Sequence, residues 1–213
     1  LADPCDSSGT GGTSASGTVT VGNTGTGITV RATRVKIGGI SPSSANLVSG
    51  NARGIVVIGD DNTVAGNLVG TTANGKGALG NTQEGVYVSG DGNTIGGATD
   101  AERNLIAGNA FDGIFLAVTA TDNVVTRNLI GVNILKTVVL GNGYAGIRVD
   151  GTGNTIGGPG NGNLVGGNFR GIYVNASGNV VQGNAVGVEP TVGTKLPNEE
   201  EGILVVAPDV TIG

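Results

Sequence analysis

The hydrophobic and polar positions of this chain alternate in a short phrase that recurs along its length. The phrase has a glycine, an aliphatic residue, a variable residue and a second aliphatic residue, and in most copies a Gly/Asn/Asp turn then leads into Asn-x-Ile or Asn-x-Val. Aliphatic residues at every second position, in a segment bounded by turn residues, predict a β-strand with one buried face. The intervals of 25 to 33 residues between copies indicate a solenoid. Seven copies begin at Gly27, Gly54, Gly85, Gly113, Gly146, Gly171 and Gly202.

Asparagines recur with the same spacing in three columns, one near each bend of a coil with three short strands. Equivalent asparagines one coil apart can hydrogen-bond to each other as a ladder and so satisfy the buried amides of the bends. We therefore predict structural ladders. The first column is Asn62, Asn93, Asn123, Asn154 and Asn179; the second is Asn46, Asn67, Asn104, Asn128, Asn163 and Asn184; the third is Asn51, Asn81, Asn109, Asn142, Asn168 and Asn198.

The pattern predicts an all-β fold, a single-stranded parallel β-helix of about seven coils with three strands per coil, over residues 17–213. Long and short coils alternate, because an extra segment delays the second asparagine in every other coil. The remaining coils have long loops instead, each with one lysine. Residues 1–16 are rich in Gly, Ser and Thr and are expected to form a flexible arm. Because the final residues stop in mid-coil, the C-terminal end is expected to be open. The long loops are residues 70–80, 131–141 and 187–197.

Composition excludes several classes of protein. The 43 glycines lack the every-third-residue period of collagen. A net charge of −5 with scattered basic residues argues against nucleic-acid binding. No apolar run approaches the roughly 20 residues that span a bilayer. We predict no metal site and no cofactor. A chain without Met or His that is rich in Gly, Thr and Asn suits an extracellular or cell-surface location. Its one cysteine, Cys5, is either a lone thiol near a terminus or pairs with a cysteine of another chain or of a segment outside this sequence.

One stretch of the chain resembles a known class of repeats. Residues 92–97 (Gly-Asn-Thr-Ile-Gly-Gly), 104–109 (Asn-Leu-Ile-Ala-Gly-Asn) and Gly113-Ile114 are similar to the degenerate repeats of large secreted bacterial surface proteins. These repeats belong with the right-handed parallel β-helix proteins of the pectate-lyase-like superfamily. The resemblance implies right-handed winding over residues from about 20 to 213. It does not define an activity, because β-helices host many functions.

The enzymes of that superfamily use clustered aspartates together with histidine, arginine or tyrosine. Here Asp60-Asp61 is the only Asp-Asp pair, and the chain has no histidine. Asp60, Asp61 and Asp91 fall in turns, where aspartate is common for conformational reasons. A carboxylate pair or a calcium site at these turns is a weaker hypothesis. We predict that no residue is catalytic and that the protein is not an enzyme.

The variable residue of the repeated phrase points outward, because the two residues beside it point into the core. From Thr29 onward this outward column is mostly aromatic and aliphatic, which predicts a binding stripe on one face. The alternative is that a long loop or the N-terminal arm covers the stripe. Phe111 and Phe169 are expected to pack at a corner instead. The predicted stripe residues are Val56, Tyr87, Phe115, Arg148, Tyr173 and Leu204.

These features together predict a non-catalytic, extracellular structural or adhesive module that self-assembles through its open ends or through the stripe. The expected partners are other copies of the chain or flanking repeats of a longer chain, with carbohydrate as a further candidate. The alternative function is a polysaccharide-binding or polysaccharide-degrading β-helix protein, which would be a lyase, a hydrolase or a tailspike-like protein.

Overall fold

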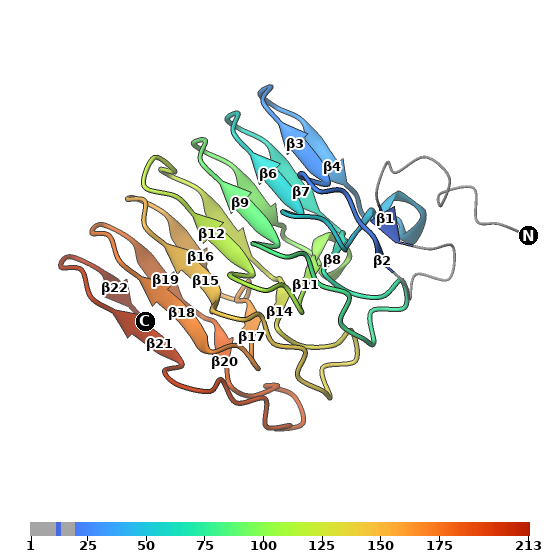
Figure 1. Cartoon of the computed structure of the whole chain (residues 1–213). Helices are drawn as coiled ribbons and strands as arrows, with labels where there is room; N and C mark the ends of the chain where they lie inside the picture. Colours follow the sequence, from blue (N-terminus) through green and yellow to red (C-terminus); the bar gives the residue numbers. More distant parts are fainter. Residues whose placement is uncertain (1–11, 14–19) are drawn as a thin grey trace, which may run out of the picture.

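The chain folds into an all-β parallel solenoid of about six turns (Figure 1). This computed structural model describes residues 12–13 and 20–213. Three sheets of parallel strands run along the solenoid, and each turn contributes one strand to each sheet in a fixed order. The prediction of a parallel β-helix with three strands per coil is confirmed, and right-handed winding stays a prediction.

The strands are short, as a coil with three bends requires. Sheet I contains β3 (Ile28–Val30), β6 (Ile55–Val57), β9 (Val86–Val88), β12 (Ile114–Leu116), β15 (Ala145–Val149), β18 (Arg170–Val174) and β21 (Ile203–Val205). Sheet II contains β4 (Lys36–Gly38), β7 (Thr63–Ala65), β10 (Thr94–Gly96), β13 (Val124–Thr126), β16 (Thr155–Gly157), β19 (Val180–Gln182) and β22 (Thr211–Ile212). Sheet III contains β5 (Leu47–Val48), β8 (Leu68–Val69), β11 (Leu105–Ile106), β14 (Leu129–Ile130), β17 (Leu164–Val165) and β20 (Ala185–Val186).

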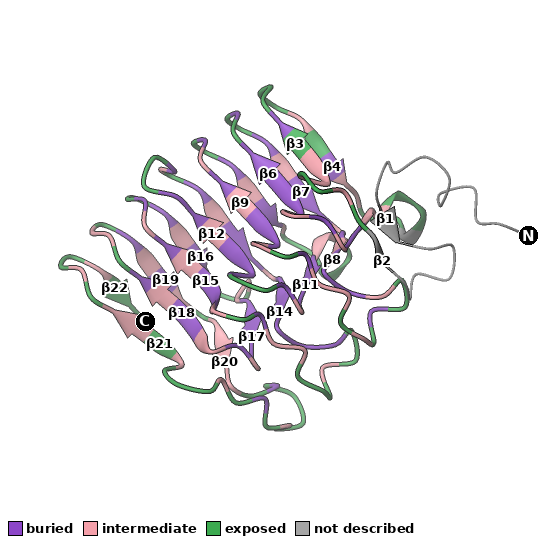
Figure 2. Ribbon diagram, viewed as in Figure 1, coloured by how far each residue is buried: buried purple, intermediate pink, exposed green. Residues whose placement is uncertain are grey.

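The repeated phrases lie over one another in register. Ile114 pairs with Val86 on one side and with Ile147 on the other, so the inward residues of neighbouring coils stack. In the inner coils such inward residues are fully buried, whereas most of the residues between them are partly exposed (Figure 2). The core is therefore a narrow column of Val, Ile and Leu, which are the side chains that fit between pleated strands.

All three asparagine columns form ladders. In each column the backbone N–H, and at most steps the side-chain amide, donates to the Oδ1 of the asparagine in the next coil. Examples are Asn93 Nδ2 to Asn123 Oδ1 at 3.0 Å, Asn104 Nδ2 to Asn128 Oδ1 at 2.9 Å, and Asn109 Nδ2 to Asn142 Oδ1 at 2.9 Å. Because these residues are buried, the ladders supply partners that water cannot.

The alternation of coils is also confirmed. Extra residues after β4 and β10 form loops that contain the 3₁₀ turns η1 (Pro42–Ser44) and η2 (Asp100–Glu102). After β7, β13 and β19 the chain instead turns directly into sheet III. These extra loops therefore project from the corner between sheets II and III at every second coil.

The three long loops fold back onto the outer face of sheet III and build a second, smaller core. Each loop is a small hairpin closed by an antiparallel bridge. Val132 and Leu196 from the loops pack with Leu105, Leu129 and Leu164 of the sheet. The loops therefore cover an apolar sheet face.

The loops also contact one another. Ile134 N donates to Gly75 O at 2.9 Å, and Lys136 Nζ lies 3.8 Å from Glu189 Oε1. The lysine of the second loop is thus engaged by the third loop.

At the N-terminal end, β1 (Gly12–Thr13) pairs antiparallel with β2 (Thr20–Val21). The strand β1 falls within the stretch predicted to be an arm. The rest of that stretch, including Cys5, lies outside the described residues.

Candidate functional site

The predicted outward column lies on the outer face of sheet I, with its members paired across adjacent strands. Thr29, Val56 and Tyr87 are in register, and the column continues through Phe115, Arg148, Tyr173 and Leu204. Six strand spacings of about 4.8 Å make the column roughly 30 Å long.

One predicted member contributes little surface. Val56 is only 7% exposed, because its short side chain lies beside the larger Tyr87 of the next strand. Tyr87, Phe115, Arg148, Tyr173 and Leu204 are half-buried. The accessible part of the stripe therefore begins at Tyr87.

Aromatic rings from two columns meet on this face. The Tyr87 and Phe115 rings pack edge to face, with centroids 5.5 Å apart. The Tyr144 ring stacks on Phe169 at 6.1 Å and meets Tyr173 edge to face at 6.3 Å. Such pairs stabilise by about 0.5–1.5 kcal/mol beyond their buried area.

Phe169, which was expected to pack at a corner, stacks on Tyr144, and Tyr144 in turn meets Tyr173 of the stripe. Tyr144 was not among the residues predicted from the sequence. The signal was present: Gln83, Phe111, Tyr144 and Phe169 occupy the same place in successive copies, two residues before the repeated glycine. Phe111 is 53% exposed at the same corner. All six aromatic residues of the chain therefore lie on this face or at the corner that leads into it.

Arginines lie over these rings. The Arg53 guanidinium carbon is 4.8 Å from the centroid of Tyr87, and that of Arg148 is 4.7 Å from the centroid of Phe115. The Arg170 guanidinium lies within 5.8 Å of the centroids of Tyr144, Phe169 and Tyr173. We call the aromatic face the set Arg53, Tyr87, Phe115, Tyr144, Arg148, Phe169, Arg170 and Tyr173.

Each of these arginines also pairs with an acid. Arg53 Nε lies 2.7 Å from Glu84 Oε2, and Arg148 makes a two-pronged pair with Asp150 at 3.1 and 2.7 Å. Arg170 contacts Glu200 at 3.1 Å and Glu201 at 2.8 Å. The aromatic face is consequently rich in charge and nearly balanced in sign.

Asp112 lies just behind the aromatic face and is 3% exposed. Its Oδ1 accepts a hydrogen bond from the backbone N–H of Ala145 at 3.0 Å. Burial raises the pKa of Asp112 from 3.8 to about 7, and the Ala145 hydrogen bond and the charge of Arg148 offset only part of that rise. The proton is therefore held more tightly in the folded chain than in the unfolded one.

We expect the carboxyl group of Asp112 to make the stability of the folded chain depend on pH. Its favourable contribution is complete below pH 3.8 and is lost as the pH rises to about 7. Asp112→Asn keeps the Oδ1 acceptor and removes the charge, so at about pH 8 it should raise the free energy of unfolding by up to about 4 kcal/mol. Chemical denaturation at about pH 4 and pH 8 measures this. An equal effect of the substitution at both pH values would contradict it.

The acids singled out from the sequence serve the turns of the solenoid. Asp60 Oδ1 accepts the backbone N–H of Asp91 at 2.9 Å, and Asp91 Oδ1 accepts that of Thr121 at 2.9 Å. Asp61 has a φ of 56°, a left-handed turn conformation that aspartate tolerates. Within residues 12–13 and 20–213, no three His, Cys, Asp or Glu side chains are grouped as a metal site would require.

The described long loops pack on sheet III, so they leave the aromatic face uncovered. Across the part of the chain that the structure describes, no helix has the length and apolar character needed to cross a membrane.

Comparison of the chain with protein-family models, with curated proteins and with solved structures found no match. The chain is therefore characterised by its fold, an all-β parallel solenoid with buried asparagine ladders. Its function has to be argued from the surface of that solenoid.

Proposed function

We propose that this protein is a non-catalytic structural or adhesive module that acts at the cell surface or outside the cell and docks through its aromatic face. The observation that supports this proposal is that five of the six aromatic residues gather on the aromatic face, with Phe111 at the corner beside it and three arginines over the rings. Tyr, Phe and Arg are enriched at protein interfaces, and Tyr and Arg are also enriched among the residues that contribute most of the binding energy.

The proposed partner is a second copy of the chain. Two copies related by a twofold axis present the same patch to each other, so the patch must complement itself. The balanced pairs Arg53–Glu84, Arg148–Asp150 and Arg170–Glu201 meet this condition, whereas a face of one charge sign would repel its copy. The resemblance to secreted bacterial surface repeats agrees with such a role and with the proposed location.

A second candidate, polysaccharide binding or degradation, is favoured only by the presence of exposed rings. Sugars stack on the faces of aromatic rings, and here guanidinium groups lie over Tyr87 and Phe115. The turn aspartates already accept backbone hydrogen bonds, which leaves degradation without a distinct pair of acids.

Sedimentation velocity over about 1 µM to 1 mM tests the proposal, since weak interfaces have dissociation constants in that range. We expect concentration-dependent dimers that the double substitution Tyr87→Lys and Phe115→Lys abolishes. The two lysines of each copy would lie against those of the other copy and repel them, and the contacts that the Tyr87 and Phe115 rings make would be lost. The rings are half-buried and outward, so the monomer should remain folded.

Thr155→Lys is the matched control, because Thr155 is half-buried and outward on sheet II, away from the aromatic face. It should leave dimerisation unchanged. A wild-type chain that stays monomeric throughout, or dimers that survive the double substitution, would overturn the proposal. Binding of a glycan array that the same double substitution abolishes would instead support the polysaccharide candidate.

A further inference from the structure

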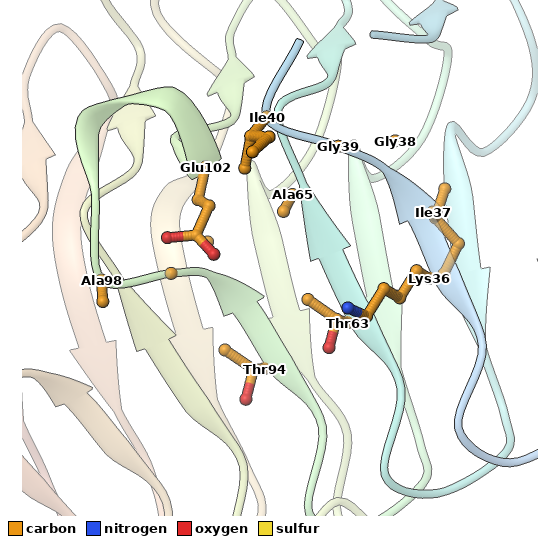
Figure 3. Close-up of a pocket in the computed structure, with 12 residues that line it drawn as sticks. Lys36, Ile37, Gly38, Gly39, Ile40, Thr63, Ala65, Thr94, Ala98 and Glu102 are labelled. Carbon is orange, nitrogen blue, oxygen red and sulfur yellow. The ribbon is translucent and has the colours of Figure 1, made fainter. Parts of the chain in front are cut away.

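A cavity of about 490 Å³ lies on the outer face of sheet II above β4, β7 and β10 (Figure 3). One wall is Gly39 and Ile40, at the start of the loop that contains η1, and the other is Gly97, Ala98 and Glu102, from the loop that contains η2. Between them β7 turns directly at Gly66, whose N–H donates to Glu102 O at 3.0 Å. A Cβ at Gly66 would lie only 2.0 Å from Gly39 O, so the two loops close over this corner. The alternation of coils thus produces a cavity bounded on three sides.

The floor of the cavity consists of small residues. Gly38, Ala65 and Gly96 occupy equivalent places at the ends of β4, β7 and β10. Gly38 and Gly96 have φ values of 84° and 102°, which favour glycine. Ala65 has no such constraint, and the equivalent residue of β13 is Thr126. The small side chain of Ala65 therefore keeps this space open.

Polar groups of opposite character face the cavity. Lys36, Thr63 and Thr94 point outward from three adjacent strands, in register. Among the described residues, Lys36 makes no ion pair and the two threonine hydroxyls make no hydrogen bond within the chain. Glu102, the last residue of η2, faces the cavity from the opposite side (Figure 3).

Glu102 is ionised, and only one of its two carboxylate oxygens is hydrogen-bonded within its own turn. Its Oε2 accepts hydrogen bonds from the backbone N–H and the hydroxyl of Thr99, both at 2.9 Å. These bonds lower the pKa of Glu102, and the charge of Lys36 adds a smaller effect in the same direction. Oε1 is left to interact with a cation or another donor.

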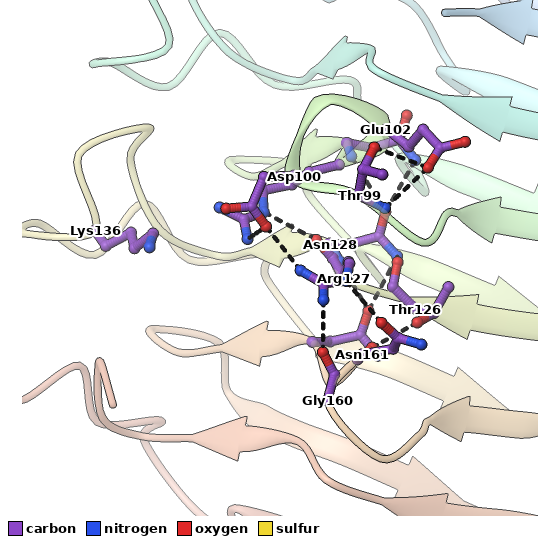
Figure 4. Close-up of polar contacts among 12 residues, drawn as sticks. Thr99, Asp100, Glu102, Thr126, Arg127, Asn128, Lys136, Gly160 and Asn161 are labelled. Carbon is purple, nitrogen blue, oxygen red and sulfur yellow. Dashed lines mark hydrogen bonds and ion pairs between the residues drawn. The ribbon is translucent and has the colours of Figure 1, made fainter. Parts of the chain in front are cut away.

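The next equivalent corner, after β13, is filled by the chain itself. The Thr126 hydroxyl donates to Asn161 O, and the Arg127 guanidinium donates to Asp100 Oδ1 at 2.9 Å, Asn161 Oδ1 at 2.8 Å and Gly160 O at 2.7 Å (Figure 4). Side chains thus tie the two neighbouring loops together there.

Arg127 makes these contacts from a strained backbone. Its φ is 57°, at the place where the other short corners have Gly66 and Gly183. A left-handed conformation costs a residue with a Cβ roughly 1–2 kcal/mol, so the bridging contacts must offset that cost. The first corner, with Ala65 and Gly66, has no side chain that can bridge its loops.

We propose that the cavity over β7 binds a small zwitterion, a free amino acid or a dipeptide. The carboxylate pairs with Lys36 and the ammonium group pairs with Glu102, while Thr63 and Thr94 donate and accept hydrogen bonds between them. Ile40, which is 68% exposed at the rim, and Ala65 contact the apolar part of the ligand.

The dimensions agree with a ligand of this size. The strands β4 and β10 are two spacings apart, which is about 10 Å. One or two residues of extended chain span about 3.5–7 Å, so a free amino acid or a dipeptide is short enough to lie across these three strands. Longer peptides would have to leave the cavity over the loops.

Isothermal titration calorimetry with leucine and with glycyl-leucine tests the inference. Lys36→Met removes the cation and keeps the aliphatic stem, and Glu102→Gln removes the anion while it can still accept the hydrogen bonds from Thr99. We expect each substitution to weaken binding of the better ligand by at least about tenfold, since each removes a charge-assisted hydrogen bond.

The controls separate recognition of a zwitterion from nonspecific binding. Lys76→Met changes an exposed lysine of a long loop and should leave the affinity within about twofold. N-acetyl-leucine amide lacks both charges and should not bind. The inference is overturned if neither zwitterion binds the unmodified chain, if the capped amide binds equally well, or if Lys36→Met has no effect. These outcomes are independent of dimerisation through the aromatic face.

Discussion

Asn128→Ala is expected to lower the free energy of unfolding by roughly 3–5 kcal/mol, because it leaves several buried groups without partners. Asn128 is fully buried in the second ladder. It accepts from Asn104 Nδ2 at 2.9 Å and donates to Asn163 Oδ1 at 3.0 Å and to Ile95 O at 2.9 Å. Water cannot reach the former partners of Asn128 when its side chain is removed. Each partner left without a hydrogen bond lowers the free energy of unfolding by about 1–3 kcal/mol.

The same substitution at the last member of that ladder is the control. Asn184 makes similar contacts but is half-buried, so water can replace its amide. Asn184→Ala should therefore cost only about 1–2 kcal/mol. Urea denaturation followed by circular dichroism compares the two. If both variants lost the same small amount, the ladders would contribute little beyond filling space.

Gly141→Ala is expected to destabilise the chain by about 3 kcal/mol or more, because the new methyl group would overlap backbone of the next coil. A Cβ at Gly141 would lie 1.9 Å from Gly167 O and 2.9 Å from the carbonyl carbon. Neighbouring coils are held only about 4.8 Å apart, so the backbone cannot yield locally without breaking the ladder beside it. Thermal unfolding of the purified variant would show a lowered midpoint or an unfolded chain.

Gly25→Ala provides a matched comparison. Nothing lies within 4 Å of a Cβ at Gly25, and its φ is not in the left-handed region. This variant should retain its stability to within about 0.5 kcal/mol. A Gly141→Ala chain that unfolds at the same denaturant concentration as Gly25→Ala would mean that adjacent coils can separate more easily than their hydrogen bonds suggest.

Much of the fold could be predicted from the sequence because every coil repeats the same local rules. The alternation in Gly85-Val86-Tyr87-Val88 is the side-chain period of a strand, and the register of each strand is repeated by the next copy. The asparagine columns follow from the same repetition, since identical residues one coil apart must stack. The outward column was predicted for the same reason, and Tyr87, Phe115 and Tyr173 lie on it.

The candidate sites were predicted less completely, because they depend on side chains that reach across coils. Tyr144 connects Phe169 to Tyr173 only through the direction of its ring. Val56 matches the outward pattern, yet the bulk of its neighbour buries it. Local periodicity gives a side and a register, but it contains no information on how far a neighbouring side chain extends.

The sequence by itself determined the parallel solenoid, the inward aliphatic column, the ladders and the alternation of coils, all of which follow from short-range period and repetition. Only the tertiary structure decided that the long loops cover sheet III, that arginines cover the rings of sheet I, and that the loops around β7 enclose a cavity while Arg127 fills the next corner. The physical reason is that these features arise from packing between irregular segments, whose paths are set by the space and partners that neighbouring coils provide.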